Sequence, residues 1–210
     1  MKIAIFGANG GIGKFIVKHA LEDGHQVVAY ARNTDKITTS NDLTIIKGEL
    51  NDFNAIRTAL SGCDAVISAL GPPVKPTYVG TAVLDGHKNI IKAMDELRIK
   101  RLITLATPSV KFKDDRKSII TVLPGMIAGM ALPKARREII DFVQAVTESD
   151  LDWTIVRIVS PKDSSFIGKA KVTFGDVKVK FKISREDIAK FMLDTCEKGE
   201  YINSMPIIGS

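Results

Sequence analysis

The sequence has few cysteines and no long hydrophobic run, and each shortage excludes a class of protein. Its only cysteines, Cys63 and Cys196, lie far apart and outside any CxxC motif. They predict buried thiols in a reducing compartment, not a disulfide framework or a zinc site. The longest apolar run, residues 119–132, is broken by a proline and two glycines and is too short to span a bilayer. No membrane partner is therefore expected.

The sequence also lacks a basic, apolar leader of the secretory kind, a repeat and a flexible linker. Its 210 residues are enough for one well-packed core, so we expect one domain over residues 1–210, in a soluble protein of the cytoplasm. Thirty Lys and Arg against twenty-four Asp and Glu give a net charge of +6. This modest excess fits either an anionic ligand or an ordinary solvated surface.

Short β-branched runs alternate with longer amphipathic stretches. This rhythm predicts an α/β fold, a Rossmann-like, doubly wound and mostly parallel sheet with helices on both faces. The expected strands are Lys2–Phe6, Gln26–Ala31, Leu43–Ile46, Ala65–Ala69, Arg101–Leu105 and Thr154–Ile158, with a last short strand at 206–208. Helices are expected to begin near Ile12, Asp52, Gly80 and Lys134, with an uncertain one within 118–132 and a last one capped by Ser184 and Asp187.

A different pattern appears before the last helix. Residues 171–174 and 177–181 alternate around Gly175 and Asp176, a two-residue turn signal that predicts a small C-terminal hairpin added to the sheet. The lysines of residues 169–182 alternate as the exposed face of such a hairpin should. A nucleic-acid-binding arm is the alternative, but aromatic residues are sparse there, and no nucleic-acid partner is expected.

The first expected strand ends in a glycine-rich turn. Glycines at three-residue spacing before a helix allow a tight turn and let backbone N–H groups approach a diphosphate. We therefore predict a dinucleotide site, with a purely structural turn as the alternative. Its residues are Gly7, Ala8, Asn9, Gly10, Gly11, Ile12 and Gly13. A Walker-type triphosphate loop is disfavoured because Ala8 replaces its first glycine and Phe15 replaces its hydroxyl residue.

The end of the second expected strand indicates which dinucleotide binds. NAD sites usually place a carboxylate there for the ribose 2′-hydroxyl, whereas NADP sites supply a cation for the 2′-phosphate. Residues 29–33 contain no acid, and Arg32 is the cation expected to bind the phosphate. NADP(H) is therefore expected in preference to NAD(H). A surface arginine without a ligand is the alternative reading of Arg32.

Together with the glycine turn, further segments resemble the atypical short-chain dehydrogenase/reductase group. This group includes NmrA-like regulators and the flavin reductase/biliverdin-IXβ reductase type. The matching segments are 31–33, 48–50, 63–71, 151–157 and 183–193, so the resemblance runs nearly end to end.

The resemblance implies contacts for this chain. Glu49 and Leu50 would frame the adenine, although the group usually has Asp at position 49. The residues that would pass beneath the ribose and phosphates are Ala69, Leu70 and Gly71. Thr107 would lie beside the nicotinamide and is the candidate catalytic residue.

The chain departs from the short-chain pattern in its catalytic residues. Those enzymes typically use a Tyr-x-x-x-Lys pair to exchange a proton with the substrate oxygen. The tyrosines here are Tyr30, Tyr78 and Tyr201, and none has a lysine four residues on. Ordinary alcohol dehydrogenation is therefore disfavoured. An NADPH-dependent reductase acting on a flat small-molecule acceptor, such as a flavin or quinone, is favoured because positioning does most of that work.

A non-catalytic function fits the same residues. An NADP(H)-binding redox sensor that acts through a protein partner needs the glycine turn and no catalytic group. The apolar 119–132 segment would then be a contact surface instead of a pocket wall. His19, His25 and His87 show no metal spacing, so no metal is expected and a solvated or structural role is predicted for each. The sequence leaves open the substrate and whether the protein is a monomer or a homodimer.

Overall fold

A computed structural model describes residues 1–34, 37, 40–73, 75, 77–118 and 132–210. The helix expected within 118–132 therefore lies almost entirely outside the described residues, as does most of the apolar 119–132 segment. Among the described helices, none is both long enough and apolar enough to cross a membrane.

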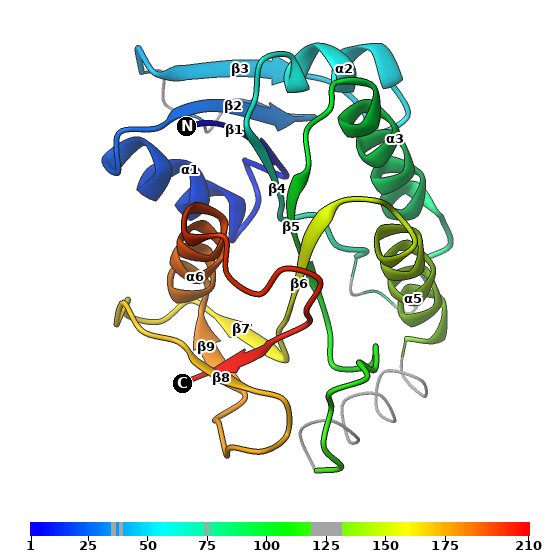
Figure 1. The fold of residues 1–210 in the computed structure, drawn as a ribbon, viewed down its shortest axis with the longest axis vertical. Helices are drawn as coiled ribbons and strands as arrows, with labels where there is room; N and C mark the ends of the chain where they lie inside the picture. The colour runs from blue at the N-terminus through cyan, green and yellow to red at the C-terminus, as the bar shows by residue number, and fades with distance from the viewer. Residues whose placement is uncertain (35–36, 38–39, 74, 76, 119–131) are drawn as a thin grey trace.

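The architecture is an eight-stranded sheet in the order β3-β2-β1-β4-β5-β6-β10-β8 (Figure 1). The strands are β1 (Lys2–Phe6), β2 (Gln26–Ala31), β3 (Leu43–Lys47), β4 (Ala65–Ser68), β5 (Arg101–Ala106), β6 (Asp152–Arg157), β8 (Lys171–Thr173) and β10 (Ile207–Gly209). Neighbouring strands run parallel except for β8, which is antiparallel to β10. The predicted Rossmann-like α/β fold is confirmed.

Helices cover both faces of this sheet (Figure 1). One face carries α1 (Gly13–Glu22) and α6 (Arg185–Lys198), and the other carries α2 (Phe53–Leu60), α3 (Ala82–Glu96) and α5 (Pro133–Thr147). Successive residues of a strand point to opposite faces. In β1, Ile3 and Ile5 therefore join the core beneath α1 and α6, whereas Ala4 and Phe6 join the core beneath the other three helices.

Local capping signals set several helix ends. Asp52 accepts a hydrogen bond from the backbone N–H of Ala55 at 2.9 Å and begins α2. Ser184 accepts from the N–H of Asp187 at 2.8 Å and begins α6, which confirms the predicted capping pair. Gly199 ends α6 in the left-handed conformation that glycine adopts without strain.

The predicted C-terminal hairpin is wrong. The turn at Gly175-Asp176 is closed by side chains, because the Thr173 hydroxyl donates to the Val177 carbonyl oxygen and Asp176 accepts from the Phe174 N–H. β8 pairs with β10, and Lys180 exchanges backbone hydrogen bonds with Ser210. The C-terminal strand β10 thus pairs with β8 in place of residues 177–181, which were expected to form the second strand of the hairpin. β9 (Lys182–Ser184) pairs with β7 (Ser160–Lys162) in a separate two-stranded sheet.

Candidate functional site

The glycine turn between β1 and α1 is closed by its own backbone. The N–H of Gly10 donates to the carbonyl oxygen of Gly7 at 2.8 Å, and Gly7 has a φ of 72°, in the left-handed region. A Cβ on Gly13 would overlap that same carbonyl oxygen, and one on Gly10 would lie 3.0 Å from it. Gly7 and Gly13 are therefore required by this turn, and a side chain at Gly10 would press against the Gly7 carbonyl oxygen.

The turn packs against the end of β4. A Cβ on Gly7 would lie 3.3 Å from the backbone of Ala69 and 3.4 Å from the side chain of Leu70. A Cβ on Gly71 would meet no described atom within 4 Å. The structure thus brings the glycine turn and residues 69–71 together, with open space at Gly71.

The helix that follows begins at the turn. Ile12 is the N-cap of α1, and the first turn of the helix contains no acidic residue. The first N–H groups of a helix have no partner within it, and the helix dipole gives this end a partial positive charge. Here Lys14 N–H donates to the Gly10 carbonyl oxygen at 3.1 Å and Phe15 N–H to that of Ile12 at 2.9 Å, so an anion would have to be met by N–H groups of the glycine-rich turn itself.

The turn after β2 is tied to the glycine turn. The Asn9 side-chain amide donates to the backbone oxygen of Asn33 at 3.0 Å. Arg32, just before Asn33, is exposed at the carboxyl end of β2. Asn9 therefore has a positioning contact in this structure, and the residue that follows Arg32 touches the glycine turn.

The predicted adenine residues lie at the carboxyl end of β3. The Tyr30 hydroxyl donates to the Glu49 carbonyl oxygen at 2.8 Å, and a Cβ on Gly48 would overlap that hydroxyl. Burial raises the pKa of Tyr30 to about 12, so its phenol stays protonated. Glu49 itself is exposed, and Leu50 packs against Gly86 of α3.

Thr107 follows β5 in a loop that is held in place by hydrogen bonds from a buried arginine, Arg157. The Thr107 hydroxyl lies 2.6 Å from that of Ser109, which is buried. The fully buried Arg157 donates to both carboxylate oxygens of Asp115, at 2.7 and 2.6 Å, and to the Val110 carbonyl oxygen at 3.0 Å. This bidentate pair fixes the loop that carries the hydroxyl pair.

The sequence interpretation missed Glu138, which is buried although it lies on α5. Its carboxylate accepts from the N–H groups of Val83 and Leu84, at 2.8 and 3.2 Å, and from the Tyr78 hydroxyl at 2.7 Å. Glu138 thus caps α3 from a neighbouring helix. Its position on the apolar face, with Ala135 and Phe142, is the sequence signal that could have revealed it.

None of the three phenols is poised as an acid beside the glycine turn. Tyr30 and Tyr78 already donate to acceptors of the protein, and burial together with the bond to Glu138 raises the pKa of Tyr78 to about 12. Tyr201 lies at the opposite edge of the sheet, because its neighbour Asn203 donates to Trp153 near the start of β6.

His87 has a structural environment. It is fully buried, stacks on Phe142 at 4.3 Å, and its Nε2 lies 3.0 Å from the Thr104 hydroxyl and 3.2 Å from that of Ser68. Burial lowers the pKa of His87 to about 4. Of the two alternatives for this histidine, the structural one is confirmed. In the described part of the chain, no group of three or more His, Cys, Asp or Glu residues could hold a metal ion.

Comparison with known proteins gives a family match and several relatives. A family model described as NAD(P)H-binding matches residues 7–198. Cinnamoyl-CoA reductase 1 of Petunia hybrida is 28% identical over 131 residues, 58% of this chain and 39% of that enzyme. Photosystem II assembly factor Ycf39 of Cyanophora paradoxa is 31% identical over 106 residues, 49% of this chain and 33% of that protein. The chain thus spans well under half the length of these curated relatives.

Two solved structures share the fold over the whole chain. A wide-type short-chain dehydrogenase/reductase of Veillonella parvula, in complex with NADP, gives a TM-score of 0.80 at 18% identity and covers 100% of this chain and 94% of that one. An oxidoreductase of Lactococcus lactis gives a TM-score of 0.80 at 19% identity, covering 100% of this chain and 91% of that one. At such identities these structures establish the fold alone.

Proposed function

Because this chain belongs to the NAD(P)H-binding family whose model spans residues 7–198, within the atypical short-chain dehydrogenase/reductase group, we propose that it is an NADPH-dependent reductase. Its substrate in this proposal is a flat acceptor such as a flavin or quinone. The observation that carries the proposal is the intact glycine turn packed on Ala69 and Leu70, combined with phenols that are all engaged or remote. The bound cofactor would supply hydride from its nicotinamide ring.

Each group of residues has a role in this proposal. Backbone N–H groups of the glycine turn that leads into α1 would hold the diphosphate, and Arg32 would pair with the 2′-phosphate. Thr107, hydrogen-bonded to Ser109, orients the nicotinamide amide or the acceptor. A flat acceptor can take its proton from water, so this chemistry requires alignment rather than a protein acid.

The direct test measures NADPH oxidation by the purified protein with FAD, FMN and a soluble quinone as acceptors. We expect turnover above a buffer control with at least one acceptor. Dinucleotide binding without turnover would overturn the reductase proposal and favour the redox-sensing alternative. That alternative in turn requires different affinities for NADP and NADPH, because equal affinities would leave no redox signal to transmit.

Cofactor preference is tested by Arg32→Ala. Loss of a charge-assisted bond to the 2′-phosphate should weaken NADPH binding about tenfold or more while leaving NADH binding within about twofold, as measured by titration calorimetry. Arg57→Ala is the matched control, since Arg57 pairs with Glu96 at the surface of the α2–α3 layer. Equal losses for both dinucleotides would refute Arg32 as the phosphate ligand.

A further inference from the structure

An arginine from the C-terminal part of the chain lies against the glycine turn. A Cβ on Gly11 would lie 3.0 Å from both the Cδ and the Nε atoms of Arg185 and 3.9 Å from its Cζ. Arg185 is the first residue of α6, more than 170 positions later in the chain. The segment 183–193 contributes to the family resemblance, but no role followed for Arg185 from the sequence.

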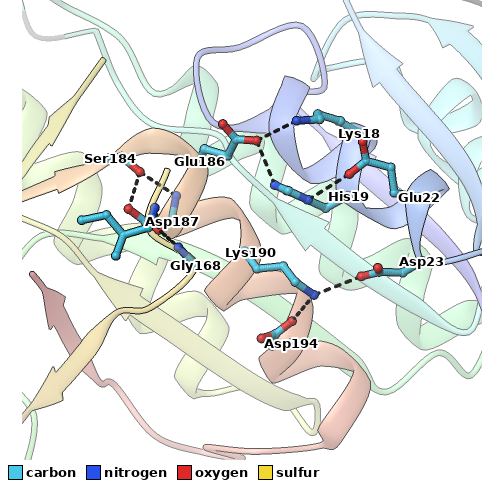
Figure 2. A network of polar contacts seen from close by, with 11 residues as sticks. Lys18, His19, Glu22, Asp23, Gly168, Ser184, Glu186, Asp187, Lys190 and Asp194 are labelled. Atoms are coloured by element: carbon cyan, nitrogen blue, oxygen red, sulfur yellow. Dashed lines mark hydrogen bonds and ion pairs between the residues drawn. The ribbon is translucent and has the colours of Figure 1, made fainter. Parts of the chain in front are cut away.

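The packing of α6 on α1 places this arginine. Glu186 accepts from Lys18 at 2.9 Å and lies 3.2 Å from the His19 ring, and Lys190 bonds Asp23 at 3.1 Å (Figure 2). The residue numbers rise together in these contacts, from Lys18 with Glu186 to Asp23 with Lys190. The helices α1 and α6 thus run in the same direction. Their N-termini therefore lie at the same edge of the sheet, where the first residue of α6 faces the turn that precedes α1.

An acidic residue, Asp163, pairs with Arg185. The Nη1 atom of Arg185 lies 2.7 Å from Oδ2 of Asp163, whose side chain is 82% exposed while that of Arg185 is 28% exposed. A pair with so exposed a carboxylate is weak, since water solvates and screens it. Asp163 follows β7 in a segment without regular structure, so its carboxylate can yield to a competing anion.

We propose that Arg185 binds the diphosphate of the dinucleotide and that Asp163 is the counter-ion that the diphosphate replaces. The inference rests on the proposed dinucleotide site and adds a second cation to it. A guanidinium beside N–H groups of a helix terminus matches a diphosphate, which accepts bidentate, charge-assisted hydrogen bonds. NADH and NADPH carry the same diphosphate, so Arg185 serves both, in contrast to Arg32.

A purely structural arginine would behave differently. If the Arg185–Asp163 pair only stabilised the loop after β7, removing either partner would have similar effects on folding and little effect on affinity. If Asp163 competes with the diphosphate, the two substitutions change affinity in opposite directions. The sign of the Asp163 effect therefore distinguishes the two roles.

The experiment measures the dissociation constants of NADPH and NADH for the full chain by titration calorimetry. Arg185→Ala should weaken both about tenfold or more and by the same factor, and Arg185→Lys should recover part of the loss. Asp163→Asn should tighten both by about twofold to fivefold, because the competing charge is gone. Lys190→Ala is the control on the same helix, with two ion pairs lost and binding expected within about twofold of wild type.

The outcomes separate this inference from the proposed function. Unchanged binding by Arg185→Ala, or weaker binding by Asp163→Asn, would overturn the diphosphate assignment while the cofactor site stands. A loss confined to NADPH would assign Arg185 to the 2′-phosphate and overturn it as well. A wild-type protein that binds neither dinucleotide would overturn the proposed function itself. Asp163→Asn retains Arg185, so it remains decisive if Arg185→Ala fails to fold.

Discussion

His87 is a residue whose burial cannot be seen from its neighbours in sequence. It stands in a polar stretch, which gives no hint that the ring is fully buried between α3 and the sheet. The ring bonds the Val83 carbonyl oxygen at 2.8 Å through Nδ1 and approaches two hydroxyls through Nε2. All these partners are neutral, so burial keeps the ring uncharged.

This environment makes stability depend on pH. Burial lowers the pKa of folded His87 to about 4, below the ordinary value near 6.5, so the unfolded chain takes up the proton first as the pH falls. Above about pH 6.5 the neutral ring makes its full contribution to the free energy of unfolding. This contribution is lost as the pH falls toward 4. Between pH 7 and pH 5, wild type should lose about 2 kcal/mol more than His87→Gln in urea unfolding. Between pH 7 and pH 9 the two proteins should change alike, and equal losses below pH 7 would contradict the prediction.

Helix α3 shows that an element can depend on a residue from another element. Its N-cap, Thr81, makes no capping bond and instead donates to the Asp85 side chain. The Glu138 carboxylate of α5 accepts hydrogen bonds from the N–H groups of Val83 and Leu84 at this end. Both helices were expected from the sequence, but a cap supplied by a helix more than 50 residues away leaves no local signal.

We expect Glu138→Ala to lower the free energy of unfolding by about 2 kcal/mol, because two backbone donors and the Tyr78 hydroxyl lose a charged acceptor. Glu138→Gln keeps an acceptor oxygen and should cost less. Arg137→Ala, on the exposed side of the same helix, should change stability by less than about 0.5 kcal/mol. Urea unfolding of the three variants provides the measurement, and equal effects of Glu138→Ala and Arg137→Ala would contradict the role of Glu138 as a cap.

At the scale of the whole molecule, local patterns predicted the central strands and the glycine turn because each has a signal within a few residues. The hairpin failed because residues 171–173 pair with residues 207–209, and a turn motif cannot show a partner that distant. The same limit applies to the site. Gly7, Gly10 and Gly13 are recognisable together, whereas Arg185 reaches Gly11 only through the packing of α6 on α1.

The two cysteines can test whether the whole structure unfolds as one unit. Cys63 belongs to the core under α2, α3 and α5, and Cys196 to the core under α1 and α6. Both are buried, and burial raises the pKa of each thiol to about 11, so neither reacts readily in the folded state. If both cores open only on global unfolding, an alkylating reagent should modify the two thiols at one rate, as followed by peptide mass spectrometry.

Protection of the two thiols by bound dinucleotide adds a second measurement to this test. A ligand that binds only the folded protein lowers the open population by the factor 1 + [L]/Kd, so NADPH at 100 times its Kd should slow both reactions about 100-fold. Because the proposed site joins β1, β4 and α6, that protection should reach both cores equally. Faster modification of Cys196 that NADPH leaves unchanged would instead mean that α6 opens on its own, with the sheet and the core around Cys63 still folded.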